Sequence, residues 1–513
     1  MSRRQTKAIV IGAGHNGLIS SLYLAKAGVK VVLLEGTEQA GGASVSQKVF
    51  AEYEAHLSRY SYLVSLMPDQ IREELELSFE TLGRRISSFT PTKIAGEDVG
   101  LLVERVPTAI TKESFAQFGA TSFTEWEDFY ARVQKLADVI APTMLGKLPS
   151  RSELKAAVGD EIWNEIMERP LGQVLEQKFS DDLVRGVVLT DGLIGTHADA
   201  HHMAANICFL YHLIGNGTGE WRVPKGGMGS LVKELLAKAN AHGVEILTSH
   251  RVSLIKRAGE TWQVECTNGA SFNAPYVLAA CAPQTLAKVS EYSAPKSLDG
   301  SQVKINMLLQ KLPRLKSGID AKDAFAGTFH IDERYSDLQM AYQQSAAGKV
   351  PDKIPAEMYC HTLTDNSILS DDLNSRGFHT LTLFGLHTPA VLFENNAAAV
   401  KAEIAHKLFT QLNEYLLDPI EECFARNSDG SPCFEIKSPL ELEAEIGLPR
   451  GNIFHKDLSM PFSEDGQARS WGVETGFPGL YLAGAGAIRG GGVSGIPGRS
   501  AAMAVLEEIG SGS

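Results

Sequence analysis

The sequence has few cysteines, no long apolar run and no excess of positive charge. Its six cysteines are scattered over 513 residues without a C-x-x-C pair, and the simplest interpretation is buried thiols in a reducing cytoplasm. The longest apolar stretch, Met203 to Gly215, contains His212 and falls short of the roughly 18 residues that span a bilayer. With 48 Lys and Arg against 61 Asp and Glu, the net charge is −13. Broad nucleic-acid binding, which needs basic surfaces, is therefore not expected.

Several familiar signatures are also missing. The chain has no G-x-S-x-G, so a hydrolase would lack its nucleophile. The first glycine loop lacks the G-K-[S/T] of a phosphate-transfer loop, which argues against an NTPase. Met1 leads through a short polar stretch straight into an apolar strand, so no secretory signal is expected. We therefore expect a cytoplasmic protein. Peripheral membrane contact stays open, although the negative net charge gives no general attraction to anionic bilayers.

Glycine, by contrast, is abundant and clustered, with 48 residues against a usual share of about 7%. The stretch Lys7 to Ile11 is apolar and β-branched and indicates a buried parallel strand. It runs into Gly12-Ala13-Gly14-His15-Asn16-Gly17, a G-x-G-x-x-G, and then into a helical pattern that Gly28 closes. A second apolar strand, Lys30 to Leu34, ends at Glu35. This order of strand, glycines, helix, strand and acid predicts a dinucleotide-binding fold.

Each residue of this unit has a physical task. Gly12 permits the tight turn, Gly14 lets the backbone approach a pyrophosphate, and Gly17 lets helix and strand pack closely. Glu35 is placed to bind ribose hydroxyls, and its charge disfavours the extra phosphate of NADP. A second pair, Gly41-Gly42, follows six residues after Glu35. Because such a pair lets another loop approach an extended dinucleotide, it favours FAD over NAD.

A second glycine-rich loop lies near the C-terminus. The apolar strand Leu480 to Ala483 leads into Gly484 to Gly498, and a helix is predicted from about Arg499 to Glu508. A helix N-terminus that follows such a loop could stabilise the negative charge that develops on a flavin when it accepts hydride. The alternative is a flexible linker, but a linker is not expected between a buried strand and a good helix.

These motifs resemble the phytoene desaturase-like FAD-dependent oxidoreductases. Pro224-Lys225-Gly226-Gly227-Met228-Gly229-Ser230-Leu231 matches the P-x-G-G-M-G-x-L signature of that family. The resemblance spans the chain and is strongest to the branch of carotenoid ketolases and pyridine nucleotide-disulfide oxidoreductase domain-containing proteins. It implies non-covalent FAD and hydride transfer to flavin N5 from a hydrophobic, polyene or lipid-like substrate. The FAD-binding set that it implies comprises Gly12, Ala13, Gly14, Asn16, Gly17, Glu35, Gly41, Gly42, Ala43, Val252, Gly484, Gly492 and Val493. Val493 would lie beside the isoalloxazine, and the Val252 backbone would touch the adenine.

One departure from the family lies at the flavin loop. Carotenoid desaturases usually have His-Pro-Gly where this chain has Ile488-Arg489-Gly490, which argues against phytoene desaturation itself. Arg489 could steady a flavin anion or an acidic substrate group, or be a surface arginine. His455 and Asp457 precede the loop and are further catalytic candidates, with a structural role as the alternative. Four residues at first suggest a metal site: His197, Asp199, His201 and His202. They lack the spacing of a helical zinc motif, so a helix cap or turn is expected and no metal is predicted.

The predicted fold class is α/β, with a discontinuous Rossmann-type FAD-binding domain, an inserted α+β substrate domain and a helical subdomain. The FAD-binding domain is assigned to residues 1–80, 221–290 and 451–513, the helical insertion to 81–220 and the substrate domain to 291–450. Short strands at 244–247, 251–256, 262–266 and 276–280 would complete the FAD-binding sheet. In the helical insertion, Phe129, Val133, Leu136 and Ile140 lie on one apolar face. The substrate domain is expected to hold strands at 302–310, 357–362 and 379–387 and a helix at 396–416.

The expected function is that of an FAD-dependent oxidoreductase acting on an apolar small molecule. Two alternatives remain: an amine-oxidase-like flavoprotein, and a flavin-binding protein without turnover that serves as an interaction partner. The electron acceptor, whether oxygen, a quinone or another compound, and the oligomeric state are left open.

Overall fold

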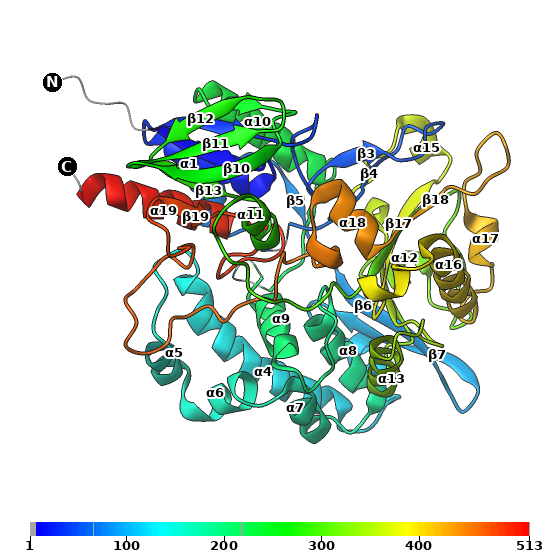
Figure 1. The fold of residues 1–513 in the computed structure, drawn as a ribbon. Coiled ribbons are helices and arrows are strands. Elements are labelled where there is room, and N and C mark those ends of the chain that lie inside the picture. Colours follow the sequence, from blue (N-terminus) through cyan, green and yellow to red (C-terminus); the bar gives the residue numbers. More distant parts are fainter. Residues whose placement is uncertain (1–6, 65, 216, 218, 512–513) are drawn as a thin grey trace.

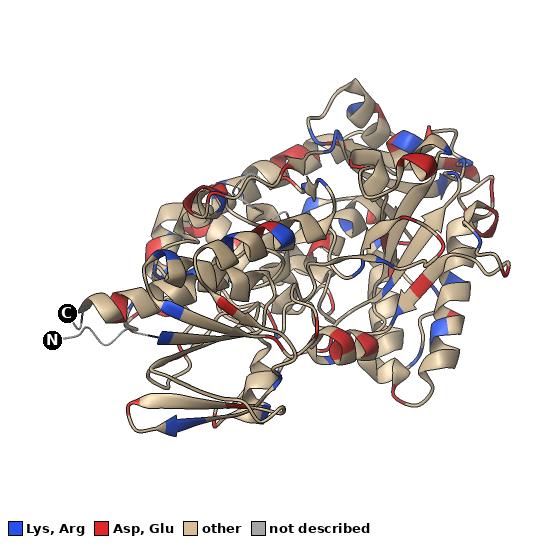
Figure 2. Cartoon of the chain, turned by 90° about the horizontal axis from the view of Figure 1, so that it is seen from above, with Lys and Arg blue, Asp and Glu red and all other residues tan. Residues whose placement is uncertain are grey.

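The computed structural model describes residues 7–64, 66–215, 217 and 219–511. The N-terminal six residues, on which the expectation about a secretory signal partly depends, lie outside these ranges. Figure 1 shows three parts: a sheet with flanking helices beside the two termini, a helical part below it, and a second, larger sheet on the right. Positive and negative residues are interspersed over all three parts rather than gathered into one stripe (Figure 2).

The first part is built on a five-stranded parallel sheet in the order β19-β13-β1-β2-β9. Its strands are β1 (Lys7–Ile11), β2 (Lys30–Leu34), β9 (Glu245–Leu247), β13 (Tyr276–Ala279) and β19 (Leu480–Leu482). Helix α1 (His15–Lys26) packs against α10 (Met228–Ala241) and α19 (Ile496–Ser511). Distant segments of the chain therefore share one sheet, which is the discontinuous Rossmann-type arrangement that the sequence predicts.

The expected strands at 251–256 and 262–266 form, but they do not join this parallel sheet. They correspond to β10 (Val252–Ala258) and β11 (Thr261–Cys266), which pair with β12 (Ser271–Ala274) in a separate antiparallel sheet. A short turn at residues 259–260 joins β10 directly to β11. Antiparallel pairing follows from this short connection, because a parallel pair needs a long crossover.

The second sheet has seven strands in the order β18-β14-β17-β16-β15-β6-β7. They are β6 (Ile86–Ile94), β7 (Glu97–Glu104), β14 (Val303–Leu309), β15 (Thr328–Ile331), β16 (Ala356–Tyr359), β17 (His379–Gly385) and β18 (Phe434–Lys437). The predicted strands at 302–310, 357–362 and 379–387 are thus present. So is the predicted helix at 396–416, as α16 (Ala397–Asn413).

The structure differs from the expected composition of the first insertion. Residues 86–104 were assigned with the helical part, whereas β6 and β7 extend the second sheet, with β6 parallel to β15. The cause is packing: Phe89 of β6 and Phe329 of β15 are both buried, and their ring centroids lie 5.8 Å apart. The helices of this insertion therefore begin only after β7.

The helical part carries its apolar face as predicted. Helix α4 (Ser122–Ile140) buries Phe129, Val133, Leu136 and Ile140 on one side. The other helices here are α3 (Ala109–Ala116), α5 (Arg151–Val158), α6 (Asp160–Met167), α7 (Leu171–Lys178), α8 (Asp182–Leu193) and α9 (Met203–Ile214). Across the described ranges, no helix combines the length and the apolar character needed to cross a membrane.

The remaining elements are mostly short. The strands among them are β3 (Ser46–Lys48), β4 (His56–Ser58), β5 (Thr81–Leu82) and β8 (Val223–Pro224). The helices are α2 (Asp69–Glu74), α11 (Pro283–Val289), α12 (Ala321–Ala324), α13 (Tyr335–Ala346), α14 (His361–Thr364), α15 (Asp371–Ser375), α17 (Ile420–Cys423) and α18 (Pro439–Ile446). Three 3₁₀ turns occupy Ala141–Thr143, Ala390–Phe393 and Pro449–Gly451.

Candidate functional site

One large cavity of about 910 Å³ joins the parts of the molecule. Its first half is lined by both glycine-rich loops, the end of β2 and the start of β10. Its second half, which we call the inner chamber, is lined by residues of α9, of the seven-stranded sheet and of the segment around α18. The volume suits an extended dinucleotide together with a small organic molecule.

The first glycine loop separates three physical tasks. Gly12 has a φ of +96°, which a residue with a Cβ adopts only under strain. A Cβ at Gly17 would lie 1.9 Å from the carbonyl oxygen of Gly12, whereas a Cβ at Gly14 would meet no protein atom within 4 Å. Helix α1 begins directly after Gly14, without a side-chain cap. Its first N–H groups and the space before Gly14 thus form an anion site open to the cavity.

Glu35 is held at the end of β2 with its carboxylate beside the same loop. The Ala13 N–H donates to Glu35 Oε2 at 2.8 Å, and the Thr37 N–H donates to Oε1 at 2.9 Å. Glu35 lines the cavity. The Thr37 hydroxyl also donates to Oε1, at 2.9 Å. The protein thus fixes the carboxylate where the sequence places a ribose ligand, and Oε2 retains a lone pair for a ligand donor.

Ten of the thirteen residues that the sequence assigns to FAD line the cavity. They are Gly12, Gly14, Asn16, Gly17, Glu35, Gly42, Ala43, Val252, Gly492 and Val493. Ala13, Gly41 and Gly484 lie behind the wall. The Gly41 N–H donates to the Ala13 carbonyl at 2.8 Å, and a Cβ at Gly484 would lie 2.5 Å from the Ala280 carbonyl oxygen. These three residues shape the loops rather than line the cavity.

Buried polar atoms in the wall indicate that a ligand completes this half of the cavity. Asn16 Oδ1 and His455 Nδ1 are buried and find no hydrogen-bond partner among the residues that the structure describes. Both residues line the cavity. Burial lowers the pKa of His455 to about 4, so its ring is neutral. Because buried polar atoms are almost always paired in proteins, a polar dinucleotide fits these residues.

The inner chamber has aromatic walls with a few polar groups. Tyr62, Phe384 and Trp221 line it, with ring centroids of Tyr62 and Phe384 5.3 Å apart. Lys304 also lines it, although the side chain is almost completely buried. Lys304 Nζ donates to the Ser58 carbonyl at 2.9 Å and lies 5.3 Å from the Phe384 ring centroid. Burial lowers the pKa of Lys304 to about 7, so this amine can exchange a proton near neutral pH.

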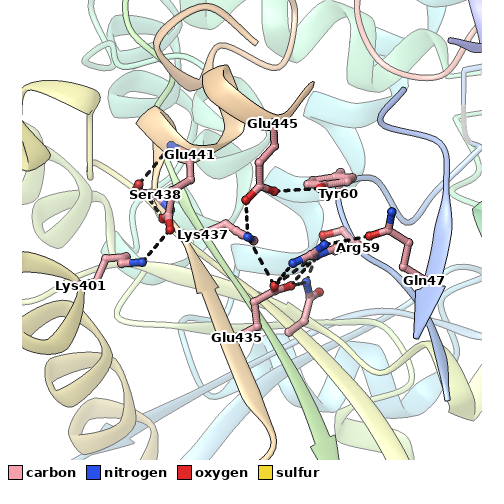
Figure 3. Close-up of polar contacts among 10 residues, drawn as sticks. Gln47, Arg59, Tyr60, Lys401, Glu435, Lys437, Ser438, Glu441 and Glu445 are labelled. Atoms are coloured by element: carbon pink, nitrogen blue, oxygen red, sulfur yellow. Dashed lines mark hydrogen bonds and ion pairs between the residues drawn. The ribbon is translucent and has the colours of Figure 1, made fainter. Parts of the chain in front are cut away.

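Helix α18 and the turn after it form another wall of the cavity, from Leu442 to Leu448. Figure 3 shows the polar network that holds this helix. The Tyr60 hydroxyl donates to Glu445 at 2.8 Å, and Lys437 forms ion pairs with Glu445 and with Glu435 of β18. Arg59 donates to Glu435 in turn, and to Gln47 of β3 at 2.9 Å. This network joins α18 to the segment that enters the chamber at Tyr62.

The three predicted catalytic residues are not brought together. His455 lines the cavity, whereas Asp457 and Arg489 do not. Asp457 accepts hydrogen bonds at 3.0 Å from the Ser297 hydroxyl and the Leu298 N–H. Arg489 is 1% exposed, and its guanidinium donates to backbone carbonyls of the turn at residues 144–147. These hydrogen bonds hold the C-terminal glycine loop against the helical part.

The histidine cluster serves local structure. His202 caps α9, because its Nδ1 accepts from the Ala204 N–H at 3.1 Å, which confirms the predicted helix cap. Asp199 accepts from the His201 N–H at 2.7 Å, and His197 Nε2 lies 2.8 Å from the Ser345 hydroxyl.

Sequence reasoning missed the polar residues of the inner chamber, Lys304 and Glu357. Their strands offered a signal, since Lys304 stands in V-K-I-N-M-L-L and Glu357 in A-E-M-Y. A charged residue within an otherwise apolar strand is expensive to bury and is a candidate for a functional group.

A Rossmann-type sheet whose glycine loops and acid-ended second strand line a large cavity is typical of a dinucleotide-binding protein. The profile of the flavin containing amine oxidoreductase family matches residues 17–307. The chain belongs to this family. It is a flavin-dependent oxidoreductase, and its cofactor is FAD.

Two relatives match over nearly the whole chain. An uncharacterized protein of Mycobacterium tuberculosis is 40% identical, over 98% of this chain and 97% of its own. The pyridine nucleotide-disulfide oxidoreductase domain-containing protein 2 of Rattus norvegicus is 28% identical, over 98% of this chain and 93% of its own.

Two further comparisons are more distant. The phytoene desaturase (lycopene-forming) of Pantoea ananas is 25% identical over 49% of this chain and 50% of its own. The solved structure of a putrescine oxidase variant superposes with a TM-score of 0.61 over 99% of this chain and all of that chain, at 17% identity. The latter likeness is one of fold.

Proposed function

We propose that this chain oxidises a C–H bond of a hydrophobic, polyene- or lipid-like small molecule held in the inner chamber. One observation carries the proposal: the cavity runs without interruption from the glycine loops to the aromatic walls around Tyr62, Trp221 and Phe384. The partial likeness to a phytoene desaturase supports it. FAD, bound without a covalent link, would supply the oxidant, a flavin whose N5 accepts a hydride equivalent.

The residues of the chamber would bind the substrate and keep water away from it. Aromatic faces offer a large apolar contact area to an extended chain or ring. Leu66 and Ile194 add aliphatic surface to the same cavity. Lys304 Nζ is available to hold or release a proton near neutral pH, because burial lowers its pKa to about 7. A bound apolar substrate between these walls would exclude water, and the loss of water would strengthen each polar contact inside the chamber.

An amine substrate is the second candidate, and Glu357 favours it. Its carboxyl lines the chamber, and no ion pair of Glu357 occurs within the described part of the chain. A substrate amine could donate a hydrogen bond to this carboxyl while its apolar body contacts the aromatic walls. The family match is consistent with this candidate.

Anaerobic mixing of the holoenzyme with three probes tests the proposal. Squalene, which is colourless, represents a polyene, n-octanol an uncharged aliphatic chain, and n-octylamine the same chain with an amine. Bleaching of the flavin absorption by squalene or n-octanol is expected, and bleaching by n-octylamine alone would favour the second candidate. Reoxidation of the reduced protein by oxygen or a soluble quinone would then identify the class of electron acceptor.

If none of the three probes reduces the flavin while light-driven chemical reduction does, turnover of these substrate classes is refuted. The third interpretation, a flavin-binding interaction protein, would then be favoured.

A further inference from the structure

A row of residues on one face of the seven-stranded sheet, most of them polar, crosses the sheet at the chamber. Lys304 of β14 stands opposite Phe384 of β17, Phe384 opposite Glu357 of β16, and Glu357 opposite His330 of β15. Residues directly opposite on neighbouring strands share one face of the sheet. Thr90 of β6 ends the row, with its hydroxyl 3.0 Å from His330 Nδ1. The first three residues line the cavity, so Glu357 is where the row passes from the chamber into the protein interior.

Two further carboxyl groups, one buried and one half-buried, interact electrostatically with Glu357. Asp191 belongs to α8, and Glu333 follows β15 and is 0% exposed. Burial, together with the charge of Asp191, raises the pKa of Glu357 to about 8. Burial raises the pKa of Asp191 to about 7. Burial and the charge of Glu357 raise the pKa of Glu333 well above its ordinary value.

Little positive charge opposes these carboxyls. His330 is neutral, because burial lowers its pKa to about 3. Arg84 is a cation whose charge acts on the Glu357 carboxyl. Its guanidinium lies 5.7 Å from the centroid of the Tyr359 ring. Lys304 Nζ is turned toward the Ser58 carbonyl, on the far side of Phe384.

Uncharged groups complete the surroundings of Glu357. The Tyr359 side chain hydrogen-bonds with Glu357, and its ring lies 4.1 Å from that of Tyr62. The Cys208 thiol, on the α9 side, donates to the Asp191 carbonyl at 3.4 Å, and burial raises its pKa. Glu357 thus has one face toward the cavity and carboxyl neighbours behind it.

We propose that Glu357 is the residue of the inner chamber that accepts the substrate proton. The proposal rests on the proposed function, because oxidation of a substrate H–C–X–H to C=X releases a proton besides a hydride equivalent. The C–H bond breaks with both electrons going to the oxidant that FAD supplies. The X–H bond breaks with its electrons forming the new C=X bond. Its proton joins a carboxylate oxygen of Glu357.

Burial makes this step favourable. An exposed carboxylate is too weak a base for the task, whereas a base that titrates near the working pH serves best. Desolvation strengthens the carboxylate as a base, and the charge of Asp191 strengthens it further. Glu333 is not among the groups whose charge acts on the pKa of Glu357.

The rate of flavin reduction against pH tests the assignment, with whichever of squalene, n-octanol and n-octylamine reduces the wild-type flavin. The wild-type rate is expected to rise as Glu357 ionises, around pH 8.

Glu357→Gln should slow reduction by about 10²–10⁴-fold, the usual worth of a positioned base. Asp191→Asn should move the midpoint of the profile about one unit lower, because a like charge is removed. Glu333→Gln is the matched control and should leave the midpoint in place. A Glu357→Gln variant that keeps the wild-type rate and profile overturns the proposal.

Infrared titration of the holoenzyme gives a readout that needs no substrate. The absorption of a protonated carboxyl should disappear around pH 8 in the wild type, be missing in Glu357→Gln and shift to lower pH in Asp191→Asn. If no carboxyl titrates there, Glu357 is not the acceptor, whatever the probes do. If the carboxyl titrates as expected and no probe reduces the flavin, the proposed function fails while Glu357 remains an ionisable group of the cavity.

Discussion

Gly14 and Gly17 stand three residues apart in one loop, and their substitutions should fail in different ways. A Cβ at Gly17 would overlap the Gly12 carbonyl oxygen at 1.9 Å, so Gly17→Ala must push α1 away from β1. We expect a loss of stability of about 1–3 kcal/mol, the usual cost of overpacking. The midpoint of thermal unfolding measures it, with and without added FAD.

Gly14→Ala is the matched comparison, because its Cβ would meet no protein atom within 4 Å. Its unfolding midpoint without FAD should equal that of the wild type, whereas its affinity for FAD should fall. If Gly14→Ala binds FAD as tightly as the wild type, the loop is not the one that approaches the cofactor.

Lys304 should make stability depend on pH. Burial lowers its pKa from 10.5 to about 7, so between these values the unfolded state binds the proton more tightly than the folded state. The unfolding free energy therefore rises with pH across this window. Lys304→Met should remove that rise and stabilise the protein near pH 7 by up to a few kcal/mol, less about 1 kcal/mol for the lost hydrogen bond to Ser58.

Urea unfolding of wild type and Lys304→Met at several pH values between 7 and 10 gives the difference directly. If the unfolding free energy depends on pH equally in the two proteins, Lys304 keeps an ordinary pKa, as it would if its side chain were exposed in solution.

At the scale of elements, α18 is a cavity wall held by its polar network. Glu445→Gln weakens the contacts of the helix with Tyr60 and Lys437 at a cost of about 1 kcal/mol. A state with α18 displaced should then be populated about fivefold more often. Quenching of the flavin fluorescence by acrylamide, a neutral molecule, should increase accordingly.

Lys401→Ala is the control: Lys401 belongs to α16, and its partner Glu441 lies in the first turn of α18. It removes an ion pair with Glu441 at 2.8 Å (Figure 3), on a residue that does not line the cavity. Quenching in this variant should match the wild type, and equal quenching in all three proteins would contradict a gating role of α18.

The sequence predicts elements best where one local pattern decides them. Strand β1 and helix α1 follow from an apolar run, three glycines and a helical repeat, and the structure places them as expected. β6 and β7 were missed as sheet members because their place depends on a partner over 200 residues away, where Phe89 meets Phe329. The C-terminal loop shows both cases: Gly492 and Val493, which the sequence assigns to the FAD site, line the cavity, while Gly484 lies behind its wall and Arg489 turns to carbonyls that no local pattern reveals.

At the scale of the whole molecule, the FAD half of the cavity was predictable and the inner chamber was not. The glycine spacing and the acid at Glu35 serve the same purpose in any dinucleotide site, because the pyrophosphate requires close approach of the backbone and the ribose requires a hydrogen-bond acceptor. Lys304, Glu357 and Phe384 come from three strands that meet only when the second sheet forms. Their chemistry depends on burial by Tyr62 and by α9, which a linear pattern does not encode.

The cavity gathers segments from both ends of the chain, so FAD should stabilise the molecule as a unit. Ligand at 100 times its dissociation constant adds about 2.7 kcal/mol, which a shift of the unfolding midpoint reports. FMN lacks the adenosine half and leaves Glu35 without a ligand, so it should stabilise less than FAD at equal concentration.

Glu35→Gln should weaken FAD binding about tenfold, since a hydrogen bond to a charged group is worth about 1.5–3 kcal/mol, and leave FMN binding unaffected. Glu260→Gln, at an exposed turn, removes the same charge and should change neither. Equal shifts with FMN and FAD in the wild type would show that the adenosine half is not bound at Glu35.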